Sequence, residues 1–332
     1  MTAPRVTLIM APLQGYTDVV FRAAWARHFA GLDEAMAPFI STMGDKRMKP
    51  SRLKDVAPEF NPELFVVPQI MGNVAEDFIF LADHLFDMGH KQVNWNLGCP
   101  HSKIAKKQRG SGLLLYPEKI DALLTKIIPG MKPSLSVKIR LGRRNKNEIT
   151  NLLEVFDRHK VDEIILHPRT GEQMYTGTSD LDAFDRAQAA SRHSFVYNGD
   201  IVDITSYNRV RERFPHITRI MIGRGLLANP FLAEEIRGQD AGDHATRTNH
   251  AKRMERLRNF HDDLFGSYGE VFSGPGHLLG RMKGFWGYLG PSFEGSKKPL
   301  KKILKAQTIP AYTDRVAALF DLELPFKPGR PL

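Results

Sequence analysis

The sequence of 332 residues predicts an α/β fold, a (β/α)8 TIM barrel followed by a small all-α domain. Over the first two-thirds of the chain, short apolar runs alternate with longer amphipathic stretches. Most runs begin 25 to 32 residues after the previous one and end in Gly, Pro or Asn. After about residue 240 the apolar runs stop, and helical patterns with basic faces replace them. Such alternation is typical of a parallel sheet with helices on its outside.

Eight apolar runs have the length and composition of strands that are buried on both faces. They begin at Val6, Glu34, Leu64, Gln92, Leu135, Asp162, Ser194 and Arg219. Eight strand–helix units of this size match the barrel. The alternative is an open, doubly wound sheet, which favours a glycine fingerprint after the first strand. The sequence there is APLQG, which does not match that fingerprint.

Amphipathic helices are predicted between the runs, and residues 75–89 show the pattern clearly. Gly89 stands where a helix C-cap glycine belongs. The apolar positions of this segment, which share one helix face, are Phe78, Leu81, Ala82, Leu85 and Phe86.

Residues 241–332 are predicted to form a separate helical domain after a barrel of residues 1–240, with a hinge near 242–246. Helical patterns cover 250–265, 276–290 and 297–307. Residues 251–332 carry 14 Lys plus Arg and 8 Asp plus Glu, so +6 of the formal net charge of +10 lies there. A chain this basic indicates an anionic partner, nucleic acid first. The alternative is that the lysines serve solubility alone.

One cysteine excludes a disulfide framework and fits a reducing, cytoplasmic location. No apolar run reaches the roughly 18–20 residues that span a bilayer, and the first residues, MTAPRVTLIMAPLQG, lack the pattern of a signal peptide. A metal site is not expected, because no second cysteine or H-x3-H spacing accompanies the thiol. We expect a monomer that binds neither membrane nor metal.

Polar side chains gather at the carboxyl ends of the predicted strands, which meet at one rim of a parallel barrel. They are Gln69, Asn94, Asn96, Cys99, Lys138, Arg140, His167, Arg169, Asn198, Asp200 and Arg224, the last of which follows Gly223 at the end of the eighth strand. An amide, a thiol, a lysine, a histidine and arginines on one rim indicate a functional site.

Individual residues have competing interpretations. Cys99, between Gly98 and Pro100, fits a reactive thiol in an exposed, fixed loop, although a free cysteine is usually a small buried residue. Lys138 would be costly to bury unpaired, which favours a bound anion or cofactor oxygen. His167 fits a core histidine equally well.

Gly223–Gly225 precede a predicted helix and, with Arg224, favour a phosphate cradle over a simple tight turn. Asn198–Asp200 would form the other lip. Gln69, Lys138 and the backbone near Pro12 could surround a pyrimidine-like ring. The site therefore fits a phosphorylated cofactor.

The motifs around these residues resemble, in order and spacing, those of the tRNA-dihydrouridine synthases. They are APLQGYTD, QIMGN, VNWNLGCPHSK, GSGLLL, LSVKIRLG, HPRTGEQMYTG, YNGDI and IGRGLLANPFL, which together span the barrel. HLLGRMKGFWGYLG is similar to the C-type bacterial branch. Two departures are APFIST, where the family often has an acidic residue, and Pro168, where a small residue is usual.

The resemblance implies an FMN enzyme that uses NADPH, or NADH, to reduce a D-loop uridine of tRNA to 5,6-dihydrouridine. Cys99 matches the catalytic acid that protonates C5 after hydride reaches C6. The implied FMN contacts are Pro12, Leu13 and Gln14 in the flavin loop, Gln69 and Lys138 on the ring, His167 beside it, and Asn198, Gly199, Asp200, Gly223 and Arg224 at the ribityl and phosphate groups.

Three basic clusters could hold the tRNA, and position 16 is the leading expectation for its target uridine. The clusters are Lys103, Lys106, Lys107 and Arg109; Arg143, Arg144 and Lys146; and Lys297, Lys298, Lys301, Lys302 and Lys305. The substrate contacts expected are Asn96, Lys103, Arg140, Lys301 and Lys302. For the third cluster, the alternative is a solvated helix face.

Two other functions stay open. One is a flavin barrel that oxidises or reduces free pyrimidines, and the other is a non-catalytic RNA-binding protein on a degenerate barrel. The basic clusters argue against the first, and Cys99, Lys138 and Gly223–Arg224 argue against the second.

Overall fold

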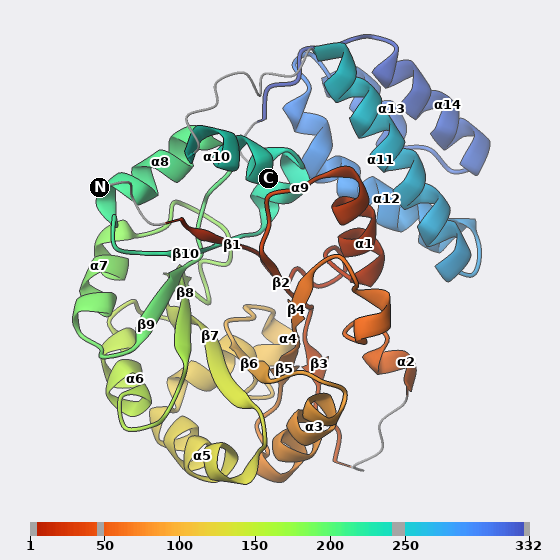
Figure 1. Cartoon of the computed structure of the whole chain (residues 1–332). Helices are drawn as coiled ribbons and strands as arrows, with labels where there is room; N and C mark the ends of the chain where they lie inside the picture. The colour runs from red at the N-terminus through yellow and green to blue at the C-terminus, as the bar shows by residue number, and fades with distance from the viewer. Residues whose placement is uncertain (1–4, 45–49, 241–249, 329–332) are drawn as a thin grey trace.

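The protein is described by a computed structural model that covers residues 5–44, 50–240 and 250–328. All eight predicted runs form strands, and every pairing is parallel (Figure 1). The strands are β1 Thr7–Met10, β2 Glu34–Met36, β3 Ile40–Ser41, β4 Phe65–Val67, β5 Gln69–Met71, β6 Gln92–Leu97, β7 Ser134–Gly142, β8 Glu163–Thr170, β9 Ser194–Tyr197 and β10 Arg219–Ile222.

The sheet closes on itself, although two of the eight runs are each divided into two short strands, which makes ten strands in all. The second run contains β2 and β3, and the third contains β4 and β5, which Pro68 separates because proline cannot donate to a ladder. β2 pairs with β4, and β3 pairs with β5, while β1 joins β2 to β10. Because β2 and β3 belong to the second run and β4 and β5 to the third, these two pairings join the same two runs. The eight runs therefore form a closed ring of paired strands. The (β/α)8 barrel is confirmed, and the open sheet is wrong.

Helices surround the barrel (Figure 1). They are α1 Val19–His28, α2 Pro50–Leu53, α3 Ala75–Asp87, α4 Ser102–Ala105, α5 Pro117–Gly130, α6 Glu148–Phe156, α7 Leu181–Ala189, α8 Ile204–Arg213, α9 Arg224–Ala228 and α10 Leu232–Asp240, with short 3-10 helices at Pro58–Phe60, Gly110–Leu115 and Gly290–Ser292. The predicted helix at 75–89 is α3. Gly89 follows it with φ +106°, a conformation that favours glycine. Phe86 is only half-buried, unlike the other predicted core positions.

The C-terminal part is helical, as predicted, and lies against α1 and α9 (Figure 1). It contains α11 His250–Val271, α12 Pro275–Leu289, α13 Lys297–Leu304 and α14 Ile309–Phe320. α14 was not predicted. Phe260 of α11 packs edge-on against Phe21 and Phe29, with ring centroids 5.9 and 5.1 Å apart, so the apolar core is continuous between the two parts. The predicted hinge at 242–246 lies outside the described residues.

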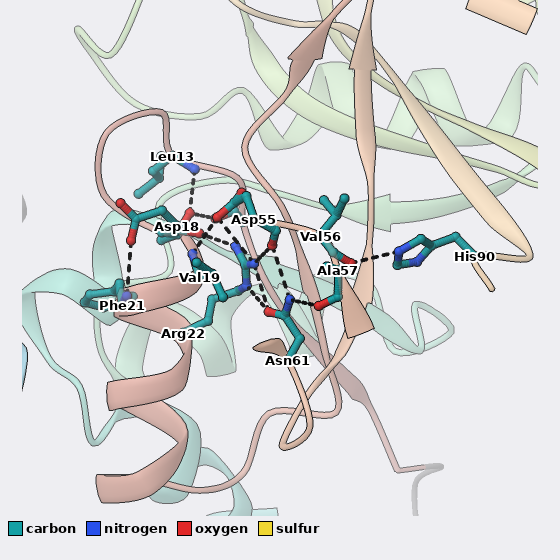
Figure 2. Close-up of polar contacts among 12 residues, drawn as sticks. Leu13, Asp18, Val19, Phe21, Arg22, Asp55, Val56, Ala57, Asn61 and His90 are labelled. Atoms are coloured by element: carbon teal, nitrogen blue, oxygen red, sulfur yellow. Dashed lines mark hydrogen bonds and ion pairs between the residues drawn. The ribbon is translucent and has the colours of Figure 1, made fainter. Parts of the chain in front are cut away.

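A polar cluster beside the first turn of α1 fixes the loop that follows β1 (Figure 2). Arg22 is 1% exposed, and its Nη1 donates to the carbonyl of Thr17 at 2.7 Å. Its Nε and Nη2 donate to Asn61 Oδ1 at 3.2 and 2.9 Å. Asp55 accepts from the amide of Val19, the first residue of α1. The loop of residues 11–18 is therefore anchored to α1 and to residues 55–61.

None of the helices in the described ranges has the length and apolar character needed to cross a membrane.

Candidate active site

A cavity of about 350 Å3 opens at the carboxyl ends of the barrel strands. Residues from the ends of β1, β6, β7, β8, β9 and β10 line it, and α12 contributes one side chain. The predicted site residues that it brings together are Pro12, Leu13, Gln14, Asn96, Cys99, Lys138, Arg140, His167, Asn198, Gly199, Asp200, Gly223 and Arg224. Gln69, Lys103, Lys301 and Lys302 lie outside its wall.

Lys138 is the least satisfied cation of the wall. It follows the buried Val137 in β7, and among the described residues its ammonium has no hydrogen bond or ion pair. Burial, followed by the charge of Arg140, lowers the pKa of Lys138 to about 7. A half-buried amine without a partner is a donor that a bound acceptor can use.

Cys99 sits in a loop whose backbone is fixed by hydrogen bonds. Its amide donates to Asn96 Oδ1 at 2.9 Å, and its carbonyl accepts from the amide and hydroxyl of Ser111 at 3.0 and 2.9 Å. Gly110 packs directly against this loop and has a φ of +54°, a conformation that favours glycine. A Cβ at Gly110 would lie 2.9 Å from the Cβ of Cys99, which is too close for a side chain. Burial raises the pKa of the thiol, so Cys99 is neutral near pH 7 and can donate a proton.

Gln69 lies behind the cavity wall. Its side chain is fully buried, its Nε2 donates to Asn94 at 2.8 Å, and its Oε1 accepts from Asn96 Nδ2 at 2.6 Å. Gln69 thereby orients Asn96, and Asn96 orients the backbone of Cys99. Its expected contact with a flavin ring stays a prediction.

His167 is held as a neutral imidazole. Its Nε2 lies 3.1 Å from Nη1 of Arg169. A guanidinium only donates, so Nε2 accepts and the proton is on Nδ1. Burial and then the charges of Arg140 and Lys138 lower the pKa of His167 well below its usual value. A neutral histidine on the cavity wall can offer a hydrogen bond without adding charge.

Asp200 organises the side of the cavity formed by the loops after β9 and β10. Its carboxylate accepts from Arg169 at 2.6 and 2.9 Å, from Arg224 at 3.2 Å and from the amide of Ser179 at 2.8 Å. Burial opposes ionisation of Asp200, but the hydrogen bonds from Arg169 and Ser179 hold its pKa below the usual range.

The predicted phosphate cradle consists of Arg224 and the backbone of Gly223–Gly225. α9 has only five residues, so its dipole is small, but the first amides of a helix have no acceptor within it. A Cβ on Gly223 would lie 3.3 Å from that of Ala11, and one on Gly199 would lie 2.5 Å from Ser179 Oγ. A side chain at 199 would displace Ser179, and one at 223 would press against Ala11, so small residues fit best at both positions.

Three tyrosines of the cavity wall were missed at the sequence level. Tyr175 lies against two guanidinium groups, with Arg224 4.5 Å and Arg140 5.4 Å from its ring centroid. Tyr288 of α12 meets Tyr16 edge-on at 5.1 Å. The motif HPRTGEQMYTG gave a signal for Tyr175, whereas nothing local to Tyr288 indicates that α12 reaches the barrel mouth.

Arg140 serves the fold as well as the cavity. It is 3% exposed and donates to the carbonyls of Gly98 at 2.9 Å, Thr170 at 2.8 Å and Met174 at 2.7 Å. Within the described ranges, Nη2 has no partner. Arg140 therefore joins the loop after β6 to the end of β8 and its following loop, and keeps one nitrogen for a ligand.

The basic clusters differ in how far they are neutralised. Arg143 donates to the carbonyl of Pro100 at 2.9 Å, Arg144 pairs with Glu172 at 3.8 Å and Lys146 pairs with Asp180 at 2.9 Å. This second cluster is thus mostly committed to protein contacts, contrary to the sequence-based expectation. In the first and third clusters, by contrast, the exposed lysines form no ion pair within the described parts of the chain; they are Lys103, Lys106, Lys107, Lys297, Lys298, Lys301, Lys302 and Lys305.

Residues 9–272 match the family model described as dihydrouridine synthase (Dus). The chain belongs to the dihydrouridine synthase family. It is 30% identical over 275 residues to a probable tRNA-dihydrouridine synthase of Staphylococcus epidermidis, covering 80% of each chain. It is 27% identical over 310 residues to one of Rhodobacter capsulatus, covering 92% of each.

Solved structures share the fold at low identity. The old yellow enzyme homologue from Zymomonas mobilis aligns with a TM-score of 0.53 and 11% identity, over 71% of this chain and 91% of that one. A 2-naphthoyl-CoA reductase complex aligns with a TM-score of 0.54 and 11% identity, over 70% of this chain and 50% of that one. The predicted family and barrel are therefore confirmed, and this member of the family is an oxidoreductase and a flavoprotein.

The cavity residues fit a flavin mononucleotide. Lys138 offers an unpaired donor inside the cavity, as the polar edge of an isoalloxazine ring requires. Arg224 and the glycine-lined backbone at 223–225 offer donors for a phosphate.

Proposed function

We propose that the protein reduces a D-loop uridine of tRNA to 5,6-dihydrouridine, with FMN as cofactor and NADPH as electron donor, as a cytoplasmic monomer. One observation carries the proposal. The neutral thiol of Cys99 and the unpaired ammonium of Lys138 line the same cavity of a dihydrouridine synthase barrel.

The residues that would hold FMN follow from the cavity wall. Lys138 and the backbone of Pro12–Gln14 would hold the ring, and His167 would lie beside it. Asn198 is fixed by the hydrogen bond from its Nδ2 to the carbonyl of Met221 at 2.8 Å. Arg224, Gly199 and Gly223 would hold the phosphate end, with Asp200 orienting Arg224. The chemistry that a bound flavin supplies here is hydride transfer to C6 of uracil.

Cys99 would supply the proton that completes the reduction. The S–H bond breaks, a C–H bond forms at C5 and the thiolate remains, so the base gains one hydride and one proton. The amide of His101 donates a hydrogen bond to the sulfur, and the charges of Arg140, Lys138 and Arg143 lie near it. These groups favour the thiolate once the proton has left, and solvent then restores the thiol.

The substrate would be a base drawn out of a folded tRNA. Unstacking costs a few kcal/mol, which phosphate contacts on a basic surface offset. Lys103 follows Cys99 on α4, and Lys301 and Lys302 are exposed on α13. Arg140 has a free nitrogen for the base or a phosphate, and Asn96 lines the same cavity. These exposed, unpaired lysines favour tRNA over a free pyrimidine, and position 16 is the expected target.

The test is reduction of tRNA by the purified protein. The protein should be yellow, with absorption in the flavin bands. With NADPH it should convert a uridine of unmodified tRNA to dihydrouridine, measured by nucleoside mass spectrometry, and free uridine should react far more slowly. A protein that binds no flavin, or that reduces free uridine as fast as tRNA, would contradict the proposal.

A further inference from the structure

The loop of residues 11–18 forms one wall of the cavity and is supported from inside the barrel domain. The amide of Leu13 donates to Thr17 Oγ1 at 2.8 Å, and the carbonyl of Thr17 accepts from Arg22 at 2.7 Å. Figure 2 shows how this support continues to Asp55 and Asn61. Pro12, Leu13 and Gln14, the residues expected at a flavin ring, are therefore held from below.

The same loop is also held by the C-terminal helices, through Asp18. Tyr268 of α11 donates to Asp18 Oδ1 at 2.6 Å, and Arg281 of α12 donates to Oδ2 at 2.6 Å. Asp18 is also the N-cap of α1 and accepts from the amide of Phe21 at 3.1 Å. One carboxylate thus joins α1, α11 and α12 directly after the cavity loop.

A second contact lies closer to the cavity. Tyr16 meets Tyr288 edge-on at 5.1 Å and Phe285 at 5.5 Å, and both partners belong to α12. Gly284 permits this approach, because a Cβ there would lie 3.2 Å from the Tyr16 ring. Tyr288 itself lines the cavity. α12 therefore completes the wall that begins with the loop.

We propose that Asp18, Arg281 and Tyr288 are positioning residues of the cofactor site, through which the C-terminal helices hold the β1–α1 loop in the shape that FMN requires. The inference rests on the proposed cofactor and extends it. The C-terminal helices then contribute to flavin affinity in addition to any contact with tRNA. Because linkage is reciprocal, bound flavin also stabilises their docking.

The test compares Arg281→Gln with Arg258→Gln. Arg258 pairs with Asp321 at 3.3 Å, away from the cavity, and is the matched control. Arg281→Gln should raise the Kd for FMN, measured by flavin fluorescence, about tenfold. It should also speed hydrogen exchange of the amides at 11–18 in the flavin-free protein. Arg281→Lys should restore both values, and Arg258→Gln should change neither.

Two milder variants keep the proposal testable if Arg281→Gln does not fold. Asp18→Asn retains an N-cap acceptor but loses the ion pair, and should weaken FMN binding in the same way. Tyr288→Phe removes one hydroxyl and should change the visible circular dichroism of bound flavin without moving the unfolding midpoint of the flavin-free protein.

The outcomes separate this inference from the proposed function. If wild type and these variants bind FMN equally and the loop exchanges at the same rate, the contacts only join two parts of the fold and the inference is wrong. If wild type itself binds no FMN, the proposed cofactor is wrong and the inference falls with it.

Discussion

The carboxylate of Asp200 accepts two hydrogen bonds, at 2.6 and 2.9 Å, from the guanidinium of Arg169, whose side chain is 1% exposed. Nε and Nη2 of Arg169 also donate to the carbonyls of Thr176 and Gly177, at 3.1 and 2.7 Å. The pair therefore fixes the loop after β8 against the loop after β9, next to the expected phosphate subsite.

Asp200→Asn should lower the free energy of unfolding by about 3–5 kcal/mol, because it leaves the buried Arg169 without its counter-charge. Chemical denaturation of the flavin-free protein at pH 7 measures the effect. The control is Asp182→Asn, which breaks an exposed pair with Arg213 and should cost less than about 1 kcal/mol. Because the pKa of Asp200 is depressed in the folded protein, its contribution should fade as the pH falls below about 4. Equal losses for both variants would show that the pair is not a structural anchor.

Lys138 should make flavin binding depend on pH. Its pKa is about 7 in the flavin-free protein, so the amine loses its charge as the pH rises through 7. If FMN binds the charged form, its Kd should increase by up to about tenfold per pH unit above 7, until the pKa of the bound state is passed. Lys138→Met should bind FMN more weakly and without this dependence, as fluorescence titrations from pH 6 to 9 would measure. A parallel pH profile in both proteins would argue against a charged Lys138 at the ring.

The same group should affect stability with a definite sign. A lysine whose pKa is lowered on folding binds fewer protons in the folded state than in the unfolded state between pH 7 and about 10.5. It therefore lowers the stability of the folded protein most below pH 7, and this effect disappears as the pH rises toward about 10.5. Lys138→Met should therefore raise the unfolding midpoint of the flavin-free protein at pH 6 more than at pH 10. A larger gain at pH 10 would contradict the lowered pKa.

Reversal of two charges on α13 should weaken tRNA binding through loss of phosphate contacts. The double variant Lys301→Glu and Lys302→Glu should bind tRNA at least about tenfold less tightly at low salt, with a smaller dependence on salt between roughly 50 and 200 mM and unchanged FMN occupancy. The matched control is Lys91→Glu with Lys160→Glu, exposed residues that precede β6 and β8 at the opposite end of the barrel. An equal loss of tRNA affinity in both double variants would show that only the net charge of the protein matters, and not the position of Lys301 and Lys302.

The barrel was predictable because its strands carry a strong local signal. A strand buried on both faces needs a continuous apolar run, and a barrel needs eight of them with helices between. Period-two alternation in β7 also placed Lys138 and Arg140 on one face, and both line the cavity. α14 was not predicted; Pro310 lies in its first turn, where proline is well tolerated.

The rest of the site depends on contacts between distant segments. Gln69 carries a strand-end amide, but only the fold reveals that its partners are Asn94 and Asn96. Arg143 was predicted to belong to a basic cluster that could hold tRNA, yet its side chain donates to the carbonyl of Pro100. Tyr288 reaches the cavity because α12 packs on the β1–α1 loop, a contact that no local pattern encodes.

The central claim is that Cys99 gives its proton to C5 of a tRNA uridine. The most direct measurement follows re-oxidation of the bound flavin after anaerobic reduction with NADPH and mixing with unmodified tRNA, together with the dihydrouridine formed. Cys99→Ala should bind FMN and accept electrons from NADPH as wild type does. Re-oxidation of its reduced flavin by tRNA should be slower than in wild type by about a hundredfold or more. Oxidation within twofold of the wild-type rate, with dihydrouridine formed in step, would contradict the account.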